Sequence, residues 1–273
     1  MFTIREYAMP ETLDEAYTIL KSRKGNQILG GCAWLRLGKK RINIAVDLTK
    51  CGLDYIREGD EQIEIGAMTS YRSVETSDIL KQYFNGVVAD SVSSIIGTQF
   101  RNTVTVGGSV YGRFGFSDFL TPLLTLDTSV VLYKKGSIPL ETFMMMPYEK
   151  EIIEKIVIKK DGRQSSYQMF RNSRGDFPIL NLAASRTKEG QWIVTVGARG
   201  PKAVRAEQTA AFLSEKLPQN AATGETVEAV IKEAGEILVS EVTFTSNMRA
   251  SAEYRSILSK VLLGKAVREV MAC

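Results

Sequence analysis

Two glycine pairs, each placed after an apolar run, constrain the fold of this 273-residue chain more than any other feature. Gly30-Gly31 follows Gln27-Ile-Leu, and Gly107-Gly108 follows Thr105-Val106. Glycine has no Cβ, so the backbone at such a pair can turn sharply and approach another group closely. An ordinary tight turn explains the pattern. A pair of turns that cradles an anion such as a pyrophosphate, with hydroxyl donors from Thr103, Thr105 and Ser109, is the alternative, which the glycine pairs alone do not favour.

The apolar spacing around these pairs predicts a mixed α+β chain. A helix is expected over residues 10–22 with Thr12 as its N-cap, and strands over 27–29 and 42–48. Further on, helical spacing covers 73–84, and a strongly apolar strand covers 129–133. The remaining elements are expected as a strand over 192–199 and helices over 206–217, 226–239 and 252–271.

The pattern changes to longer strands followed by helices beyond about residue 165, which predicts a second domain that begins near Gly162. The last helix ends the chain with a broad apolar face, of the kind an amphipathic helix uses for docking. That face is expected to contain Tyr254, Ile257, Leu258, Val261, Leu262 and Val267.

The composition narrows the chemistry that this chain can perform alone. Histidine is absent, which excludes Ser-His-Asp and Cys-His catalytic pairs and the commonest metal ligand. Cys32, Cys51 and Cys273 lie far apart, so neither a zinc knuckle nor an iron–sulfur cluster is expected from this chain. We therefore assign no catalytic residue and no metal site, and we expect a cofactor to supply the chemistry.

The charges and the N-terminus argue against several classes of partner. The 35 basic and 31 acidic side chains are spread along the chain without a block of like charge, so no nucleic-acid partner is expected. Neither an export signal nor a membrane span is expected, because the first residues are charged and no stretch approaches about 20 apolar residues. A cytoplasmic location fits the few cysteines.

Asp118 is the charged residue of a phenylalanine-rich loop that follows the second glycine pair. Its carboxylate could accept hydrogen bonds from ribose hydroxyls. Asp118 or Ser117 could instead cap a helical stretch over 119–126. Neither glycine pair matches the G-x-G-x-x-G fingerprint, and Gly264-Lys265 lacks the other residues of a phosphate loop, so neither a Rossmann nor a P-loop site is expected.

Several motifs, taken in chain order, resemble those of one family. Leu29-Gly-Gly-Cys-Ala-Trp-Leu35 is similar to a first FAD loop, typically Ala-Gly-Gly-Thr-Asp-Leu-Leu, in flavoprotein subunits of molybdenum hydroxylases of the xanthine dehydrogenase family. The other matching motifs are Ile96-Gly97, Arg101-Asn102, Thr105-Val-Gly-Gly-Ser109, Asp118, Pro122-Leu-Leu-Thr-Leu-Asp127 and the closing Arg249-Ala-Ser-Ala-Glu-Tyr-Arg255. The likeness covers nearly the whole chain.

The resemblance implies a two-lobed FAD-binding domain of the vanillyl-alcohol-oxidase (PCMH) type over 1–162, with lobes of about 1–54 and 55–162. A C-terminal domain over 163–273, with a small antiparallel sheet and helices, would follow. FAD would be bound non-covalently, with the glycine loops around the pyrophosphate, Asp118 at the ribose and Ile96-Gly97 near the flavin. The cofactor-binding residues that this implies are Leu29, Gly30, Gly31, Cys32, Ala33, Trp34, Ile96, Gly97, Thr105, Val106, Gly107, Gly108, Ser109, Arg113 and Asp118.

The chain departs from the family pattern at several of these positions. Cys32, Ala33 and Trp34 stand where Thr, Asp and Leu are usual, so the first loop must bind through its backbone. Arg113 could pair with a phosphate or could be a solvated surface residue. Two other features are given structural roles: Cys32 as an unreactive packing residue, and Met144-Met-Met146 as gap-filling core.

The function that the resemblance implies is that of an electron-transferring, FAD-binding oxidoreductase subunit. Electrons would pass from a molybdopterin-binding large subunit through two iron–sulfur clusters of a small subunit to this FAD, and then to NAD or another acceptor. Molybdopterin and the clusters would lie only in those partners. The alternatives are a stand-alone flavin reductase of the same fold and a scaffold subunit poor in FAD. The substrate, the final acceptor and the stoichiometry of the assembly do not follow from this sequence.

Overall fold

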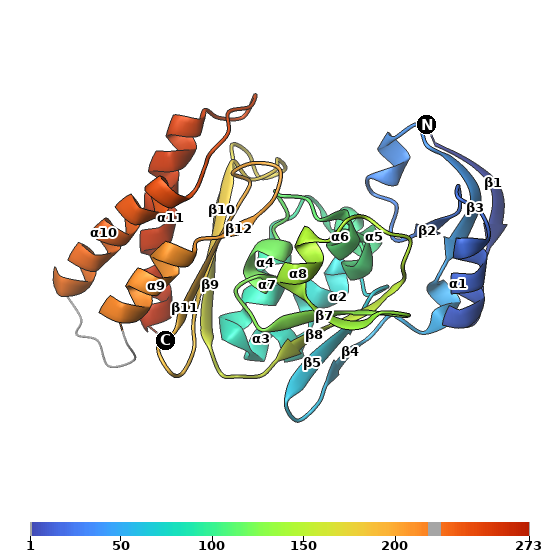
Figure 1. Cartoon of the computed structure of the whole chain (residues 1–273), viewed down its shortest axis with the longest axis horizontal. Helices are drawn as coiled ribbons and strands as arrows, with labels where there is room; N and C mark the ends of the chain where they lie inside the picture. The colour runs from blue at the N-terminus through green and yellow to red at the C-terminus, as the bar shows by residue number, and fades with distance from the viewer. Residues whose placement is uncertain (1, 218–224, 273) are drawn as a thin grey trace. The chain divides into compact units, whose positions relative to one another are not determined.

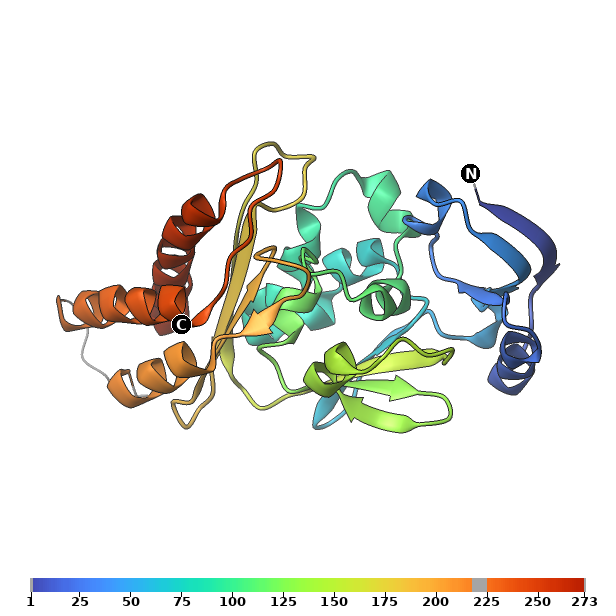
Figure 2. The same cartoon turned by 45° about the horizontal axis from the view of Figure 1, so that its top comes forward.

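The chain runs through short helices and strands first and ends in long helices, as Figures 1 and 2 show. A computed structural model describes residues 2–217 and 225–272, so Cys273 lies outside the described residues. The chain forms two compact units, each assembled from three separate segments. The first unit consists of Met1–Thr76, Gly97–Gly112 and Thr128–Lys159, and the second of Ser77–Ile96, Arg113–Asp127 and Lys160–Cys273. The domain boundary at residue 162 stays a prediction.

A small parallel sheet opens the first unit, with strand order β1-β3-β2. Its helix α1 begins after Thr12, whose Oγ1 accepts a hydrogen bond from Glu15 N at 3.2 Å, which confirms the expected N-cap. Because all three strands are parallel, the loops that follow them emerge at one edge of the sheet. The elements are β1 (Thr3–Ala8), α1 (Leu13–Ser22), β2 (Gln27–Leu29), η1 (Leu35–Leu37), β3 (Arg41–Asp47) and η2 (Thr49–Cys51).

An antiparallel sheet of order β4-β5-β8-β6-β7 completes the first unit together with short helices. Its core consists of fully buried β-branched residues, which suit a pleated surface, namely Ile63, Ile65, Val130, Ile156 and Ile158. The strand expected over 129–133 is confirmed as β6. The elements are β4 (Ile56–Glu58), β5 (Gln62–Gly66), α2 (Tyr71–Thr76), α5 (Thr98–Thr103), α6 (Val106–Gly112), β6 (Thr128–Leu132), β7 (Gly136–Pro139), α8 (Leu140–Met145) and β8 (Ile153–Lys159).

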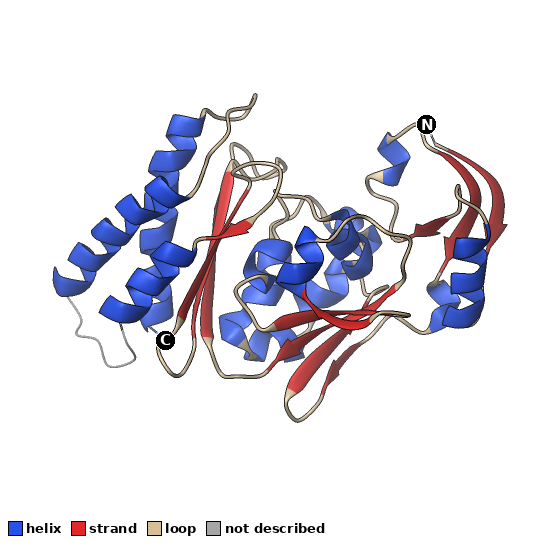
Figure 3. Cartoon of the chain, in the orientation of Figure 1, coloured by secondary structure: helices blue, strands red, loops and turns tan. Residues whose placement is uncertain are grey.

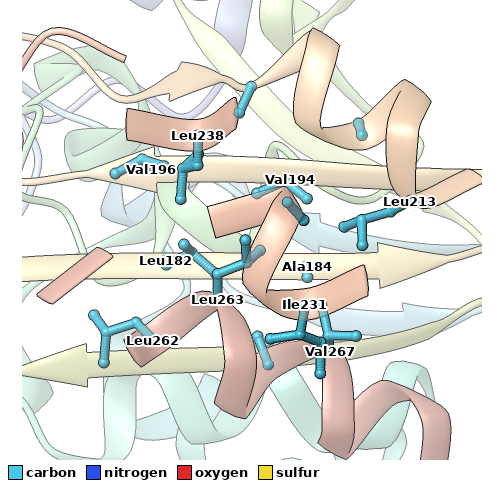
Figure 4. Packing of buried hydrophobic residues seen from close by; sticks show 14 of the residues in the cluster. Leu182, Ala184, Val194, Val196, Leu213, Ile231, Leu238, Leu262, Leu263 and Val267 are labelled. Atoms are coloured by element: carbon cyan, nitrogen blue, oxygen red, sulfur yellow. The ribbon is translucent and has the colours of Figure 1, made fainter. Parts of the chain in front are cut away.

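The second unit contains a four-stranded antiparallel sheet of order β12-β11-β10-β9. Long helices cover one face of this sheet (Figure 3). Between them lies an apolar core that includes Leu182, Val194, Leu263 and Val267 (Figure 4). The elements are β9 (Gln164–Phe170), β10 (Leu180–Arg186), β11 (Trp192–Gly197), β12 (Val204–Arg205), α9 (Glu207–Lys216), α10 (Glu225–Glu241) and α11 (Ala252–Ala272).

Four short helices from earlier in the chain also belong to the second unit. They are α3 (Asp78–Gln82), η3 (Phe84–Gly86), α4 (Val87–Ser93) and α7 (Leu120–Leu123). Of these, η3, α4 and α7 contact β9, and α7 also contacts β10 and β11. Helices and antiparallel sheets thus confirm the α+β class. As expected, the C-terminal part of the chain contains an antiparallel sheet, β12-β11-β10-β9, and the helices that cover it.

Some expected elements differ from the structure. The single helical stretch over 73–84 is broken after Thr76, because Ser77 caps a new helix by accepting a hydrogen bond from Leu80 N at 3.3 Å. The helical stretch over 119–126 is shorter, with α7 ending at Leu123. Met144 is buried as expected of a gap-filling residue, but Met145 is exposed.

The prediction of a broad apolar docking face on the last helix, α11, is wrong in part. Leu258, Leu262 and Val267 are buried, whereas Tyr254, Ile257 and Val261 are exposed. Helical spacing groups residues on a broad arc but does not say which part of the arc meets the core. Within the part of the chain that the structure describes, each helix is too short or too polar to cross a membrane.

Candidate functional site

The first glycine pair lies where β2 ends, at the carboxyl edge of the parallel sheet. This edge is where open sheets of parallel strands commonly bind ligands. Gly31 and Cys32 have φ angles of +61° and +57°, in the left-handed region, which disfavours residues with a Cβ by about 1–2 kcal/mol. A Cβ on Gly31 would also lie 1.9 Å from Thr103 O. Position 31 therefore requires glycine for two independent reasons.

The second glycine pair is not a turn, which corrects the sequence-based prediction. Gly107 and Gly108 lie inside the short helix α6. A Cβ on Gly107 would lie 2.7 Å from the Cβ of Ala67, so this glycine lets α6 pack closely on the segment after β5. Sequence alone did not show this, because a glycine pair seldom occurs within a helix.

The two glycine pairs come together within the first unit. A Cβ on Gly108 would lie 3.0 Å from Gly30 O, and a Cβ on Gly30 would lie 3.0 Å from Thr105 Oγ1. We call Gly30, Gly31, Thr105 and Gly108 the glycine contact. Its surface is backbone and one hydroxyl, which is the kind of surface that a pyrophosphate can approach closely.

The amides near the second pair already have partners in the chain. Gly107 N donates to Ala67 O at 2.7 Å, and Gly108 N donates to Thr105 Oγ1 at 3.2 Å. The hydroxyls of Thr103 and Ser109 likewise donate to backbone carbonyls of their own turns. These groups stabilise α5 and α6, and because Thr105 Oγ1 already accepts one of these hydrogen bonds, its O–H is what Thr105 can offer a ligand.

Cys32 is a thiol in a partly buried position. Burial raises its pKa, and the carboxylate of Asp47 raises it further, so the reactive thiolate is disfavoured near neutral pH. Cys32 and Cys51 are both free cysteines. This agrees with a packing role for Cys32 and gives no support to redox activity.

Asp47 was missed by the sequence analysis although it lies at the same sheet edge. It ends β3 opposite Leu29 in the strand register. Its carboxylate accepts hydrogen bonds from Tyr7 Oη at 2.7 Å and from Thr49 N at 2.9 Å. The signal was available, because an aspartate at a strand end followed two residues later by threonine is typical of an Asx turn.

The next residues of the first loop present apolar surface to solvent. The side chain of Trp34 is 41% exposed and that of Leu37 is 71% exposed. The turn that carries them is hydrogen-bonded, with Arg36 N donating to Cys32 O and Leu37 N to Trp34 O, both at 3.1 Å. The first loop is thus a fixed turn with an exposed indole.

Asp118 lies in the second unit and is 7% exposed. Its Oδ1 accepts hydrogen bonds from Tyr167 Oη at 2.5 Å and from Arg171 Nη2 at 2.7 Å. Burial raises the pKa of Asp118 more than the neighbouring guanidinium of Arg171 lowers it. Burial and Asp118 together hold the pKa of Tyr167 well above its usual value.

Of the two capping candidates, the structure favours Ser117 over Asp118, because Ser117 Oγ accepts the hydrogen bond from Leu120 N at 3.2 Å. Binding of a ribose by Asp118 stays a prediction. Neither Tyr167 nor Arg171 could be connected with Asp118 from the sequence, because 49 and 53 residues separate them from it.

Arg113 is buried in the second unit, so the interpretation as a solvated surface residue is wrong. Its backbone has a φ of +48°. The loop that follows stacks Phe114 on Phe116, with ring centroids 5.3 Å apart, and Phe116 contacts Phe177 at 4.7 Å. Pairing of Arg113 with a phosphate stays a prediction.

The Ile96-Gly97 motif divides between two structural roles. Ile96 is exposed, and its Cδ1 would lie 3.3 Å from a Cβ on Gly175, within the second unit. Gly97 is the N-cap of α5 with a φ of +67°. The structure leaves their place beside a flavin as a prediction.

Comparison with known families gives two matches that together cover most of the chain. Residues 2–160 match the model described as the FAD binding domain in molybdopterin dehydrogenase. The chain belongs to this family. Residues 165–270 match the C-terminal domain of the CO dehydrogenase flavoprotein. The cofactor of this chain is therefore FAD, and the chain is an oxidoreductase subunit.

Two of the relatives are distant but match along nearly their whole length. The glyceraldehyde dehydrogenase medium chain of Sulfolobus acidocaldarius is 23% identical, with 97% of each chain covered. The xanthine dehydrogenase FAD-binding subunit of Escherichia coli O157:H7 is 22% identical, covering 100% of this chain and 98% of that one. Among solved structures, carbon monoxide dehydrogenase from Hydrogenophaga pseudoflava matches with a TM-score of 0.84 at 20% identity, covering 99% of this chain and 98% of that chain. This last likeness shows the fold.

Proposed function

We propose that this FAD-binding subunit carries electrons from iron–sulfur clusters of a small partner subunit to NAD or another acceptor in the cytoplasm. The clusters would receive them from a molybdopterin-binding large subunit. Two observations support this distribution of FAD, iron–sulfur clusters and molybdopterin among separate subunits. Relatives bear the names of medium chains or FAD-binding subunits. This chain has three cysteines and no histidine, which is too few for the four thiolate or imidazole ligands of an iron–sulfur cluster.

The glycine contact is the observation that carries the proposal. FAD supplies two-electron and one-electron chemistry at its isoalloxazine ring, and the protein has to bind, orient and tune that ring. We expect the backbone of the first loop and the hydroxyl of Thr105 to hold the pyrophosphate, because the amides of Gly107 and Gly108 already have partners. Gly31 allows that loop to lie close to Thr103, because a Cβ at this position would be 1.9 Å from Thr103 O.

An absorption spectrum of the purified chain, followed by acid release of its flavin, tests the cofactor. Released FAD near one per chain supports the proposal. A chain that carries no flavin and takes up none from solution contradicts it and favours the scaffold alternative. Purification through an affinity tag on this chain alone then separates a subunit of a complex from a stand-alone reductase. A subunit should co-purify with the large and small subunits, whereas a stand-alone reductase should co-purify with neither.

A matched pair of variants tests the glycine contact itself. Gly31 and Gly136 both have positive φ angles, of +61° and +72°. A Cβ would lie 1.9 Å from Thr103 O at position 31 but would meet nothing within 4 Å at position 136. We expect Gly31→Ala to lower FAD affinity more than tenfold, and Gly136→Ala to leave it unchanged.

Gly108→Ala extends this test with a smaller perturbation. Its new Cβ would lie 3.0 Å from Gly30 O, which requires a shift of a few tenths of an ångström while alanine favours the helix. We expect a folded protein with weakened FAD binding. Unchanged FAD affinity in both Gly31→Ala and Gly108→Ala would show that FAD does not use the glycine contact.

A further inference from the structure

Trp34 combines two properties that the proposed FAD site does not yet explain. It follows the glycine pair by three positions, so its Cα lies within about 10 Å of that of Gly31, and its side chain is 41% exposed. The second tryptophan of the chain, Trp192, is 3% exposed and donates from Nε1 to Leu217 O at 3.1 Å. Trp192 is thus a buried, structural tryptophan with which the exposed Trp34 can be compared.

Among residues 32–37, Arg36 is the one charged side chain, and it is exposed; Cys32 and Ala33, which precede Trp34, offer a ligand little hydrogen bonding. Ala33 has only a methyl group, and the raised pKa of Cys32 keeps its sulfur a weakly polar thiol. The carbonyls of Gly30, Cys32 and Trp34 already accept hydrogen bonds from Cys32 N, Arg36 N and Leu37 N. Apart from the guanidinium of Arg36, the side chains of this turn therefore present apolar and aromatic surface to a ligand.

Backbone hydrogen bonds stabilise the turn that carries the indole of Trp34. The hydrogen bonds to Cys32 O and Trp34 O are both 3.1 Å long, and Gly31 lies so close to Thr103 that an added Cβ would be 1.9 Å from Thr103 O. A rigid aromatic side chain gives up little conformational freedom when it contacts a ligand. Planar heteroaromatic rings stack on such a side chain irrespective of their hydrogen-bonding edges.

We infer that the indole of Trp34 stacks on one of the two planar heteroaromatic rings of the bound dinucleotide, next to the pyrophosphate that the glycine contact holds. This inference rests on the proposed FAD site. The aromatic surface of Trp34 takes the place of the hydroxyl and the carboxylate that Cys32 and Ala33 do not provide. Trp34 is a positioning residue for the ring and takes no part in electron transfer chemistry.

Titration of the full chain, freed of flavin, with FAD, FMN and ADP tests this inference. Stacking is worth about five- to a hundredfold in affinity, so Trp34→Ala should weaken FAD binding by that factor and Trp34→Phe should restore most of it. Leu37→Ala removes another exposed apolar side chain from the same turn and should leave the affinity unchanged. The melting temperature of each variant shows whether it is folded.

The three ligands identify the ring. If Trp34 stacks on the isoalloxazine, Trp34→Ala weakens FAD and FMN and spares ADP; if it stacks on adenine, the variant weakens FAD and ADP and spares FMN. Tryptophan fluorescence gives a second readout, because the chain has two tryptophans and Trp34→Phe leaves only Trp192. Stacking predicts that FAD quenches the emission of the wild-type chain and that most of this quenching disappears in Trp34→Phe.

The outcomes separate this inference from the proposal on which it rests. Wild-type chain that binds no FAD contradicts the proposed function itself. Wild-type affinity in a folded Trp34→Ala variant, or equal losses in Trp34→Ala and Leu37→Ala, overturns the role of Trp34 and leaves the FAD site intact.

Discussion

In the first unit, the loop at Gly31 and Cys32 presents backbone and apolar surface and holds two successive residues at positive φ angles. In the second unit, Asp118 is buried, and Tyr167 and Arg171 both donate to one of its oxygens. In the loop, the steric room for a Cβ limits which residues can be accommodated. Around Asp118, the pairing of opposite charges limits them instead. Substitutions should therefore act on backbone geometry in the first region and on electrostatics in the second.

The largest expected effect is that of Arg171→Gln. The side chains of Arg171 and Asp118 are 7% and 8% exposed, and removal of one partner from a buried ion pair costs about 3–5 kcal/mol. Urea denaturation measures the loss. Arg249→Gln is the control, because its pair with Asp176 is 29% and 26% exposed and should cost about 1 kcal/mol or less. Equal losses in the two variants would contradict the contrast in burial.

Gly31→Ala should have the next largest effect on stability. The left-handed backbone costs alanine about 1–2 kcal/mol, and the close approach to Thr103 O adds an overpacking cost of about 1–3 kcal/mol. Gly136→Ala shares the first cost and lacks the second. Urea denaturation of both variants isolates the close approach, and a difference near zero would show that the loop moves freely away from Thr103.

The pH dependence of stability tests the burial of Asp118. Because its folded pKa is raised above the usual 3.8, the folded protein keeps a proton that the unfolded chain releases between the two pKa values. The contribution of Asp118 is therefore most favourable below pH 3.8 and declines as the pH rises through the folded pKa. Arg171→Gln should extend this decline to higher pH, because loss of the guanidinium raises the folded pKa of Asp118 further.

Denaturation at a series of pH values from about 4 to 8 measures that slope. Asp118→Asn has no proton to release at this position, so it should remove the share of the dependence that belongs to Asp118, in the wild-type and Arg171→Gln backgrounds alike. A slope that survives Asp118→Asn belongs to other groups.

The smallest expected effect is that of Cys32→Gly. Glycine relieves the cost of a φ angle of +57° but loses about 0.5–1 kcal/mol through the greater freedom of the unfolded chain. The free energy of unfolding should change by less than about 1 kcal/mol. A larger loss, measured by urea denaturation, would mean that the thiol packs more tightly than its partial burial indicates.

Local patterns were sufficient for the features that depend on neighbouring residues. Thr12 was identified as an N-cap from its position before an apolar helical repeat, and the first glycine pair was placed after the strand over 27–29 because both signals are short-range. The α+β class followed from the same alternation of spacings.

Features that depend on distant residues were not predictable in this way. The glycine contact joins Gly30 to Gly108, and the pairing of Asp118 with Arg171 spans 53 residues. The helical setting of Gly107 depends on its packing against Ala67, which outweighs the low helix propensity of glycine. Likewise, the exposure of Tyr254 is decided by how α11 packs on its sheet.

The interleaving of the two units along the chain has a consequence for synthesis on the ribosome. The chain passes from one unit to the other after residues 76, 96, 112, 127 and 159. The first unit lacks β8, the central strand of its antiparallel sheet, until Lys159 has been translated. Helix α4 is translated well before β9, the strand on which it packs. In the nascent chain, α4 is therefore exposed until β9 has been made. Packing of α4 on β9 therefore cannot be complete until Phe170, the last residue of β9, has been translated.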